Sequence, residues 1–290
     1  MNKKTLKRKI MYFLSFIPDE MYLKMVYRIK MHMPLNLSNP YLYNEKLQWL
    51  KLYDHQDFYT KMVDKYEMKQ FVIDRIGEGH VVPLLGMWDK FEDIDFSNLP
   101  NRFVLKASND QGSVIVCNNK ENLNLDKSKK ILNNSLKNNF FYVGREWPYK
   151  NVKPRIIAEE LLESNAGHKG LTDYKFFCFN GVPRIMYISN DLDDEPKTDF
   201  FDMDFNRLDM RMRDKNSEGE VEKPEFFEDM KKAAEKLSVG IPQLRVDFYC
   251  TKENYYVGEL TFFHNGGFSK IYPEKWMKIM GDWIELPNKS

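Results

Sequence analysis

Two apolar segments near the C-terminus, residues 244–250 and 255–262, are separated by only a short polar turn. Their length and their content of β-branched and aromatic residues predict an antiparallel pair of strands. Arg245 and Asp247 are two residues apart in the first segment, so their side chains point to the same face of the sheet. Glu259 occupies the matching end of the second segment, within contact distance across the pair. The sequence therefore predicts one sheet face that brings two carboxylates and a guanidinium together.

Such a face has the chemistry of a magnesium–triphosphate site. Mg²⁺ takes one or two protein carboxylates and completes its shell with phosphate oxygens. Arginine forms charge-assisted hydrogen bonds with phosphoryl oxygens. Acidic residues also occur on sheet surfaces simply for solvation, so this pair alone leaves both interpretations open.

A second segment, residues 103–116, reads as a strand that ends in Lys106, a polar turn and another apolar strand. The turn contains Gly112 and Ser113, so it offers backbone N–H groups and a hydroxyl to phosphate oxygens. It is not a P-loop, because no Gly-Lys-Ser/Thr follows and a strand comes next in place of a helix. The alternative is an ordinary hairpin with an exposed lysine.

In chain order, these segments resemble the ATP-grasp superfamily, which has a lysine strand, a glycine-containing flap, a hinge strand ending in acidic residues, and then Arg-x-Asp and Glu-x-Asn. The hinge would be residues 155–163. The resemblance implies that Lys106 contacts the α- and β-phosphates and that Lys65, in the pair Asp64-Lys65, also reaches ATP. The same resemblance places hinge residues around the adenosine, with the adenine bordered by Glu159, Glu160 and Leu162 and the ribose hydroxyls bonded to Glu163.

For Mg²⁺, the resemblance implies the ligands Asp247 and Glu259, beside the catalytic Arg245. Thr261 stands where the family has asparagine. Two alternatives follow: Thr261 is a weaker oxygen ligand, or Asn265 reaches in from the turn that follows.

Lys175 opens another strongly β-forming run. The resemblance puts it near the phosphates as a third catalytic cation, with Lys106 and Arg245. A surface lysine at a strand edge is the alternative. His264, beside the Gly266-Gly267 turn, could assist the acceptor amine, but a lone histidine is weak evidence for a catalytic role.

Further runs are similar to the TupA-like branch of the ATP-grasp proteins, which is named for teichuronopeptide biosynthesis and associated with bacterial surface-polysaccharide clusters. These runs are residues 43–54, 144–149, 173–181, 245–249, 258–262 and 281–284. The resemblance covers roughly residues 40 to 287. It implies an ATP- and Mg²⁺-dependent ligase that joins a glycan or small-molecule carboxylate to an amine through an acyl phosphate. A phosphotransferase acting on a glycan hydroxyl and a non-catalytic nucleotide-binding scaffold are the alternatives.

Composition excludes some classes of protein. The 290 residues include 44 basic and 43 acidic side chains, a balance that argues against a nucleic-acid partner. No apolar run approaches a membrane span. The three cysteines lie in predicted strands without metal-like spacing, which predicts free thiols in a cytoplasmic protein. Basic side chains predominate in residues 1–33, and two interpretations stay open. One is a helix on the inner face of an anionic membrane, in contact with the membrane or with glycan assembly proteins, and the other is a helix docked on its own catalytic core.

The pattern of elements predicts an α+β fold with two lobes that clasp ATP, preceded by a mainly helical region. We expect a helical region and linker over 1–101, a lid lobe with the hinge over 102–166, and a C-terminal lobe with the Mg–ATP site over 167–290. The helical part includes one helix over 57–75 and ends in a connection around Pro83 and Gly86. Strands are predicted near 102–107, 112–117, 155–162, 173–179 and 183–189, and helices near 126–139 and 224–238. An ATP-grasp core usually follows a Rossmann-like domain, so the helical start implies that the acceptor is held differently.

Overall fold

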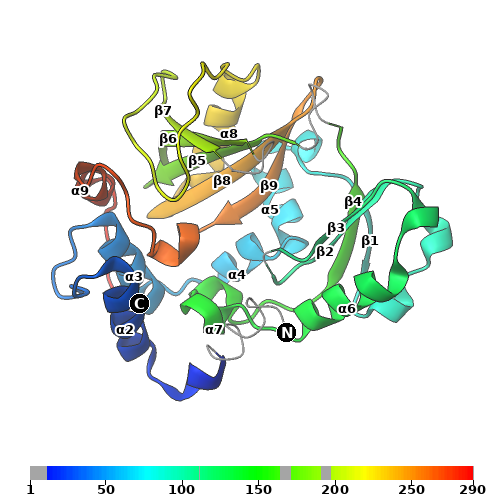
Figure 1. Ribbon diagram of the computed structural model, residues 1–290, viewed down its shortest axis with the longest axis horizontal. Coiled ribbons are helices and arrows are strands. Elements are labelled where there is room, and N and C mark those ends of the chain that lie inside the picture. The colour runs from blue at the N-terminus through cyan, green and yellow to red at the C-terminus, as the bar shows by residue number, and fades with distance from the viewer. Residues whose placement is uncertain (1–11, 111, 164–170, 191–196, 290) are drawn as a thin grey trace.

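The computed structural model describes residues 12–110, 112–163, 171–190 and 197–289. In these residues the chain forms two antiparallel sheets, with helices packed around and between them (Figure 1). The α+β class is therefore confirmed. The predicted strands and the two predicted later helices are all present, with small shifts of their ends.

The larger sheet has the strand order β7-β6-β5-β8-β9, and every neighbouring pair in it is antiparallel. Aromatic side chains from one face of it pack against helix α8: Phe176 and Phe248 lie edge to face, and Phe176 also contacts Phe227 of α8. The elements are β5 (Asp173–Phe179), β6 (Val182–Asn190), β7 (Lys197–Asp202), α8 (Phe227–Ser238), β8 (Gln243–Cys250) and β9 (Tyr255–Thr261). Strand β7 was not among the predicted strands.

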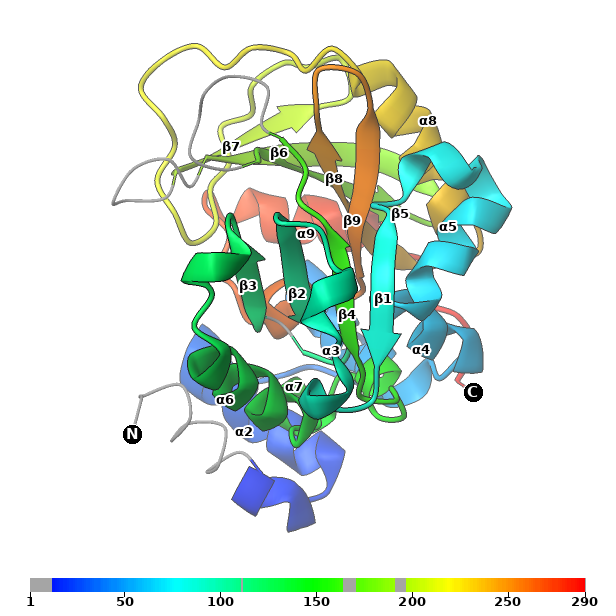
Figure 2. The ribbon, with the colours of Figure 1, turned by 90° about the vertical axis from the view of Figure 1, so that its right-hand side faces the viewer.

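The smaller sheet has the order β1-β4-β2-β3 (Figure 2). It has an apolar core of its own. That core is closed by helix α6, whose Leu132 is fully buried with Leu105 and Ala158 of the sheet. The elements are β1 (Leu84–Trp88), β2 (Phe103–Ala107), β3 (Val114–Cys117), α6 (Leu125–Leu136) and β4 (Ile156–Glu160). Two cores in one chain agree with an organisation in two lobes.

Strand β1 replaces the connection that the sequence predicted around Pro83 and Gly86, so that prediction was wrong. Residue 86 of this strand is a glycine because a Cβ there would lie 2.4 Å from the Trp88 ring. The register between β1 and β4 shifts at the same point. The glycine thus marks a bulge in an edge strand. Residues 84–88 hydrogen-bond to β4, so the smaller sheet begins before residue 102. The three domain boundaries stay predictions.

Helices from the first third of the chain, together with α7 and α9, lie beside the larger sheet and between the two sheets (Figure 1). They are α2 (Asp19–Met31), α3 (Tyr43–Tyr53), α4 (Asp57–Val63), α5 (Glu67–Ile76), α7 (Phe141–Gly144) and α9 (Lys275–Asp282). Short 3-10 turns are η1 (Leu14–Phe16), η2 (Glu78–His80), η3 (Phe91–Asp93), η4 (Phe96–Asn98), η5 (Lys120–Asn122), η6 (Trp147–Tyr149) and η7 (His264–Gly267). Among the described helices, none combines the length and apolarity needed to cross a bilayer.

The single helix predicted over 57–75 is two helices, because Asp64 is extended, with φ −73° and ψ 115°. Its carboxylate accepts hydrogen bonds from the backbone N–H of Tyr66 at 2.9 Å and from Arg155 at 3.1 Å. Such local side-chain bonds compete with helix continuation. The break turns Lys65 out of the helical register. The predicted free cysteines are confirmed: Cys117, Cys178 and Cys250 are buried thiols.

Candidate functional site

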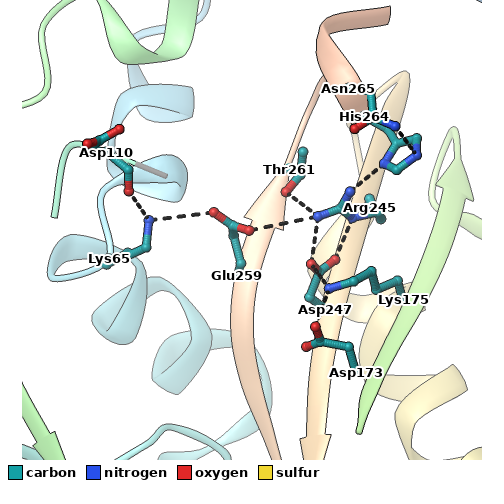
Figure 3. Close-up of polar contacts among 10 residues, drawn as sticks. All are labelled: Lys65, Asp110, Asp173, Lys175, Arg245, Asp247, Glu259, Thr261, His264 and Asn265. Atoms are coloured by element: carbon teal, nitrogen blue, oxygen red, sulfur yellow. Dashed lines mark hydrogen bonds and ion pairs between the residues drawn. The ribbon is translucent and has the colours of Figure 1, made fainter. Parts of the chain in front are cut away.

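The predicted pair of strands, β8 and β9, places its polar residues directly opposite one another. Asp247 faces Glu259, and Arg245 faces Thr261. A bulge at Gly258 sets this register, since a Cβ there would lie 2.4 Å from the Tyr249 ring. On the other side of β8, strand β5 brings a lysine into register with Asp247. Figure 3 shows these side chains gathered on one face of the larger sheet, as the sequence predicted.

Asp247 is the most strongly bonded carboxylate of this group. Arg245 donates to it through Nε and Nη2, both at 2.6 Å, and Lys175 donates from Nζ at 2.8 Å. Only 2% of Asp247 is exposed. Burial alone would raise the pKa of Asp247, but the two cations outweigh it and hold the pKa below its usual value. Burial lowers the pKa of Lys175, but Asp247, Asp173 and Tyr187 together more than reverse that shift and raise the pKa.

Arg245 also donates from Nη1 to Nδ1 of His264 at 2.5 Å. A guanidinium can only donate, so Nδ1 must accept, and neutral His264 carries its proton on Nε2. Burial and Arg245 both hold the pKa of His264 well below its usual value. The Asn265 side-chain amide lies 3.0 Å from Nε2 and 2.8 Å from Ser269 Oγ. Because Nε2 carries the proton, the amide oxygen is the atom of Asn265 that can accept from it. Asn265 is thus engaged with these two residues and is not brought to Asp247.

Glu259 is held more loosely than Asp247. Its nearest cations are Lys65, with Nζ at 3.5 Å, and Arg245, with Nη2 at 3.8 Å. Lys65 also donates to the backbone carbonyl of Asp110 at 2.8 Å, so it joins the turn after β2 to strand β9 (Figure 3). Thr261 accepts from Arg245 Nη2 at 3.1 Å. The Glu259 carboxylate is therefore available to a further ligand.

A second ionic cluster lies on the smaller sheet. Glu159 is buried between two lysines, with Lys69 Nζ at 2.6 Å from Oε1 and Lys106 Nζ at 2.6 Å from Oε2. Burial would raise the pKa of Glu159, but Lys106 and Lys69 outweigh it and lower the pKa. Lys69 belongs to α5 and Lys106 to β2. The cluster therefore fastens α5 to the smaller sheet.

These strands, lysines and hinge come in one chain order, and the model of the TupA-like ATP-grasp family matches residues 45–285. The chain belongs to the TupA-like ATP-grasp family. The predicted ATP-grasp fold and the predicted branch are both confirmed, since the match covers most of the chain.

Solved structures that resemble this TupA-like protein share little of its sequence. D-alanine–D-alanine ligase from Bacillus anthracis in complex with ATP is 16% identical, with a TM-score of 0.43 over 70% of this chain and 55% of that one. The ATP-grasp ligase PsnB with minimal precursor, Mg and ADP is 12% identical, with a TM-score of 0.40 over 75% of this chain and 57% of that one. The chain thus spans little more than half the length of these structures. No curated protein matches it significantly.

The remaining predicted residues of the TupA-like protein lie around the smaller sheet. Glu160 is exposed, and Leu162 is half-buried. Glu163 is 76% exposed at its side chain and pairs on the surface with Arg102 at 2.7 Å. Gly112 has a positive φ of 94°, and Ser113 is buried beside it in the turn that enters β3. The roles predicted for these residues, at the adenine, the ribose and the phosphates, stay predictions.

Two members of the site were missed at the level of sequence. Lys69 follows Lys65 by four residues, a spacing that would have pointed to a shared helix face if residues 64–66 were helical. Asp173 precedes Lys175 by two residues in a strand, which places it on the same face. In the structure, Asp173 lies 3.1 Å from Lys175 Nζ, and its Oδ1 is buried without a hydrogen-bond partner among the described residues.

Proposed function

We propose that the protein is an ATP- and Mg²⁺-dependent carboxylate–amine ligase that forms an amide through an acyl phosphate. The observation that carries this proposal is the face on β8 and β9, where Arg245, Asp247 and Glu259 lie together with Lys175. This arrangement supplies cations for a transferred phosphoryl group beside two carboxylates for a metal ion. Membership of the TupA-like ATP-grasp family gives the same chain order of parts.

The donor set fits Mg²⁺. Asp247 and Glu259 are opposite one another, and the Thr261 hydroxyl is a third hard oxygen on that face. Among the described residues, no group of three or more His, Cys, Asp and Glu side chains could hold a metal by itself. That agrees with an ion that takes two carboxylates and completes its shell with phosphate oxygens. When bound, Mg²⁺ would neutralise charge on the transferred phosphoryl group. Asp247 would then share its carboxylate between the ion and the two cations that bond it.

In the proposed reaction, an oxygen of the substrate carboxylate attacks the γ-phosphorus of ATP. The bond from that phosphorus to the bridging oxygen breaks, and ADP leaves. Arg245, Lys175 and Lys106 are the cations that stabilise the negative charge on the phosphoryl oxygens. An amine nitrogen then attacks the acyl carbon, phosphate leaves with the bonding electrons, and the amine loses a proton. The turn with Gly112 and Ser113 would keep water away from the acyl phosphate.

The substrate carboxylate of our proposal belongs to a bacterial surface glycan or its precursor. The support for this is the association of the TupA-like branch with surface-polysaccharide clusters, and not a contact in the structure. A phosphotransferase that uses a glycan hydroxyl is the alternative. A scaffold that binds nucleotide without turnover is the other, and Thr261 in the family's asparagine position favours it.

Product analysis separates these functions. With a carboxylate acceptor labelled with ¹⁸O and an amine, the ligase yields ADP and inorganic phosphate that carries one labelled oxygen. Unlabelled phosphate, a phosphate ester, or AMP with pyrophosphate would each contradict the ligase. Absence of any ADP in a screen of carboxylate and amine pairs, with nucleotide binding intact, would favour the scaffold.

We further propose peripheral contact with an anionic membrane surface through η1 and α2. One face of α2 is docked on the protein, with Tyr22, Leu23 and Tyr27 buried. Its other side exposes Met21 at 63% and Ile29 at 64%. Phe13 and Phe16 of the preceding segment are also exposed, and basic residues of α2 lie nearby. Apolar side chains beside basic ones favour a lipid headgroup region.

Sedimentation with vesicles tests this contact. Binding should require phosphatidylglycerol in phosphatidylcholine vesicles and fall several-fold when Phe16 and Ile29 are both replaced by serine. Equal binding to pure phosphatidylcholine, or no change in the double variant, would contradict the membrane proposal and leave the ligase proposal untouched.

A further inference from the structure

A cavity of about 290 Å³ lies next to Arg245 and Thr261. Its wall comes from parts of the chain far apart in sequence: Lys30 of α2, the segment around α7, Tyr187 of β6 and the turn η7. The helical N-terminal region thus closes one side of a space that adjoins the phosphoryl-transfer face. Cavities of this kind, with a few polar groups among aromatic ones, are the usual form of small-ligand sites.

Glu146 is the unusual member of that wall. It is 5% exposed and lies immediately after α7 in a part of the chain that has no strand. No described residue gives its carboxylate a hydrogen bond or an ion pair. Burial accordingly raises the pKa of Glu146 to about 7, although Lys51 opposes the shift. A buried carboxylate without a donor is costly, so its retention calls for a physical reason.

Lys51 does not donate a hydrogen bond to Glu146, because all three of its N–H groups already bond other acceptors. It donates to Gln48 Oε1 at 3.1 Å and to the backbone carbonyls of Gly144 at 2.8 Å and Gly266 at 2.7 Å. An ammonium group has three donors and no more. Lys51 therefore fastens the two backbone segments that border the cavity and leaves Glu146 without a proton donor.

Arg245 uses four of its five N–H donors elsewhere. Its Nε and Nη2 bond Asp247 and Thr261, and one N–H of Nη1 bonds His264. Lys30 lies at the cavity wall with its Nζ 4.4 Å from the centre of the Phe268 ring. Its charge, like that of Lys51, lowers the pKa of Glu146. A ligand that brings its own N–H donors and a positive charge would satisfy Glu146 inside the cavity, whereas a neutral hydroxyl would bring donors without charge.

We propose that this cavity binds the amine substrate and that Glu146 receives its ammonium group. The inference rests on the proposed ligase function and names the class of its second substrate: a small primary amine of about amino-acid size. The contact of the cavity with Arg245 places such an amine beside the face where the acyl phosphate would form. Glu146 is a binding residue in this account.

The test is binding to the full chain in the presence of Mg²⁺ and ADP, by saturation-transfer NMR. The probes are the standard amino acids, D-alanine, D-glutamate, ethanolamine and glucosamine, each paired with its N-acetyl derivative. At least one amine should bind, and its N-acetyl form should bind about tenfold more weakly or worse, because acetylation removes the charge. Glu146→Gln should weaken binding of the same amine by a similar factor.

Two further variants keep the result clear. Glu146→Asp retains the charge and should retain the preference for the free amine, even if it binds less tightly. Glu235→Gln, which changes an exposed carboxylate of α8, should bind like wild type. The proposal is overturned if no amine in the panel binds at 10 mM, which would mean that binding contributes less than about 3 kcal/mol. Equal binding of the N-acetyl forms, or an unchanged Glu146→Gln, would overturn it as well.

The nucleotide response separates this inference from the ligase proposal. Glu146→Gln should bind Mg²⁺ and ATP like wild type, because Glu146 is not among the residues that we assign to the nucleotide. Loss of amine binding with nucleotide binding intact supports the inference. A wild type that binds an amine through Glu146 but does not bind ATP would contradict the ligase and leave the amine site standing.

Discussion

Asp247 and Glu146 are both buried carboxylates, and Arg245 acts electrostatically on both, yet their surroundings differ completely. Asp247 accepts hydrogen bonds from two cations, which lower its pKa. Glu146 accepts none from the described residues, and burial raises its pKa to about 7. Asp247 is bonded within the fold, whereas Glu146 faces a cavity.

The difference shows what each carboxylate can contribute. A paired charge is satisfied before any ligand arrives, so Asp247 can hold Arg245 and Lys175 in place for a phosphoryl group. An unpaired buried charge destabilises the protein until a ligand satisfies it. On this account, the Asp247 region is preorganised, and the Glu146 region gains its stabilisation from substrate.

The largest expected effect is that of Asp247→Asn on stability. The variant leaves two buried cations without their carboxylate, and we expect the free energy of unfolding to fall by about 4 kcal/mol. Glu146→Gln at neutral pH should not lower it, because no ion pair is broken and an unpaired buried charge is removed. Urea unfolding of both variants measures the contrast. Equal losses in the two variants would show that Glu146 is as fully paired as Asp247.

Glu159→Gln should lower the free energy of unfolding by about 3 kcal/mol at pH 7, because Lys69 and Lys106 lose a shared partner. The folded pKa of Glu159 is below its usual value of 4.5, so this contribution is complete above about pH 4.5 and is lost as pH falls through the folded pKa. The difference in the free energy of unfolding between wild type and variant, measured by urea unfolding, should therefore decrease below about pH 4.5. Glu160→Gln, at the exposed neighbour, is the matched control, and a gap independent of pH would contradict the assignment.

Glu146 should show the opposite pH dependence. Its folded pKa is raised from 4.5 to about 7, so the folded state binds more protons than the unfolded state between these values, and wild type loses stability as pH rises through them. The groups that act on it are Lys51, Glu259, Lys30 and Arg245. Glu146→Gln has no such titration, so its stability should improve relative to wild type between pH 5 and pH 8. A relative decline over that range would mean that the ionised carboxylate is satisfied in the free protein.

The smallest expected effect is that of Thr261→Val. The variant removes one acceptor from Arg245, which keeps its two bonds to Asp247, and the free energy of unfolding should fall by about 1 kcal/mol. If Thr261 is only a weak metal ligand, the ATP-induced rise in thermal midpoint should persist in the variant. Complete loss of that rise would make Thr261 an essential ligand.

The site was predictable where it depends on local periodicity. Arg245, Asp247 and Glu259 converge because alternation along two neighbouring strands fixes their faces, and a short turn fixes their pairing. The family resemblance then gave the fold. Strand β1 was missed because a glycine after a proline usually indicates a turn. The strand needs glycine at residue 86 because the Trp88 ring lies against it, and the sequence does not show that contact.

The Glu146 region could not be predicted because its contacts join distant parts of the chain. Lys51 donates to backbone carbonyls that are 93 and 215 residues away in sequence. The sequence around residue 146 has no pattern that predicts a buried carboxylate. The break at Asp64 depends in the same way on Arg155, which lies 91 residues further on. Asn265 looked able to reach the metal ligands from sequence distance alone, but its turn directs it to His264 and Ser269.

The central claim, a Mg²⁺–ATP site on the β8–β9 face, is tested most directly by thermal unfolding with millimolar ATP, with and without Mg²⁺. Wild type should be stabilised only when both are present, by about 2.7 kcal/mol when ATP is at a hundredfold excess over its Kd. Glu259→Gln should lose most of this rise, whereas Glu253→Gln, an exposed change in the same hairpin, should keep it. No rise in wild type, or an equal rise in Glu259→Gln, would contradict the account.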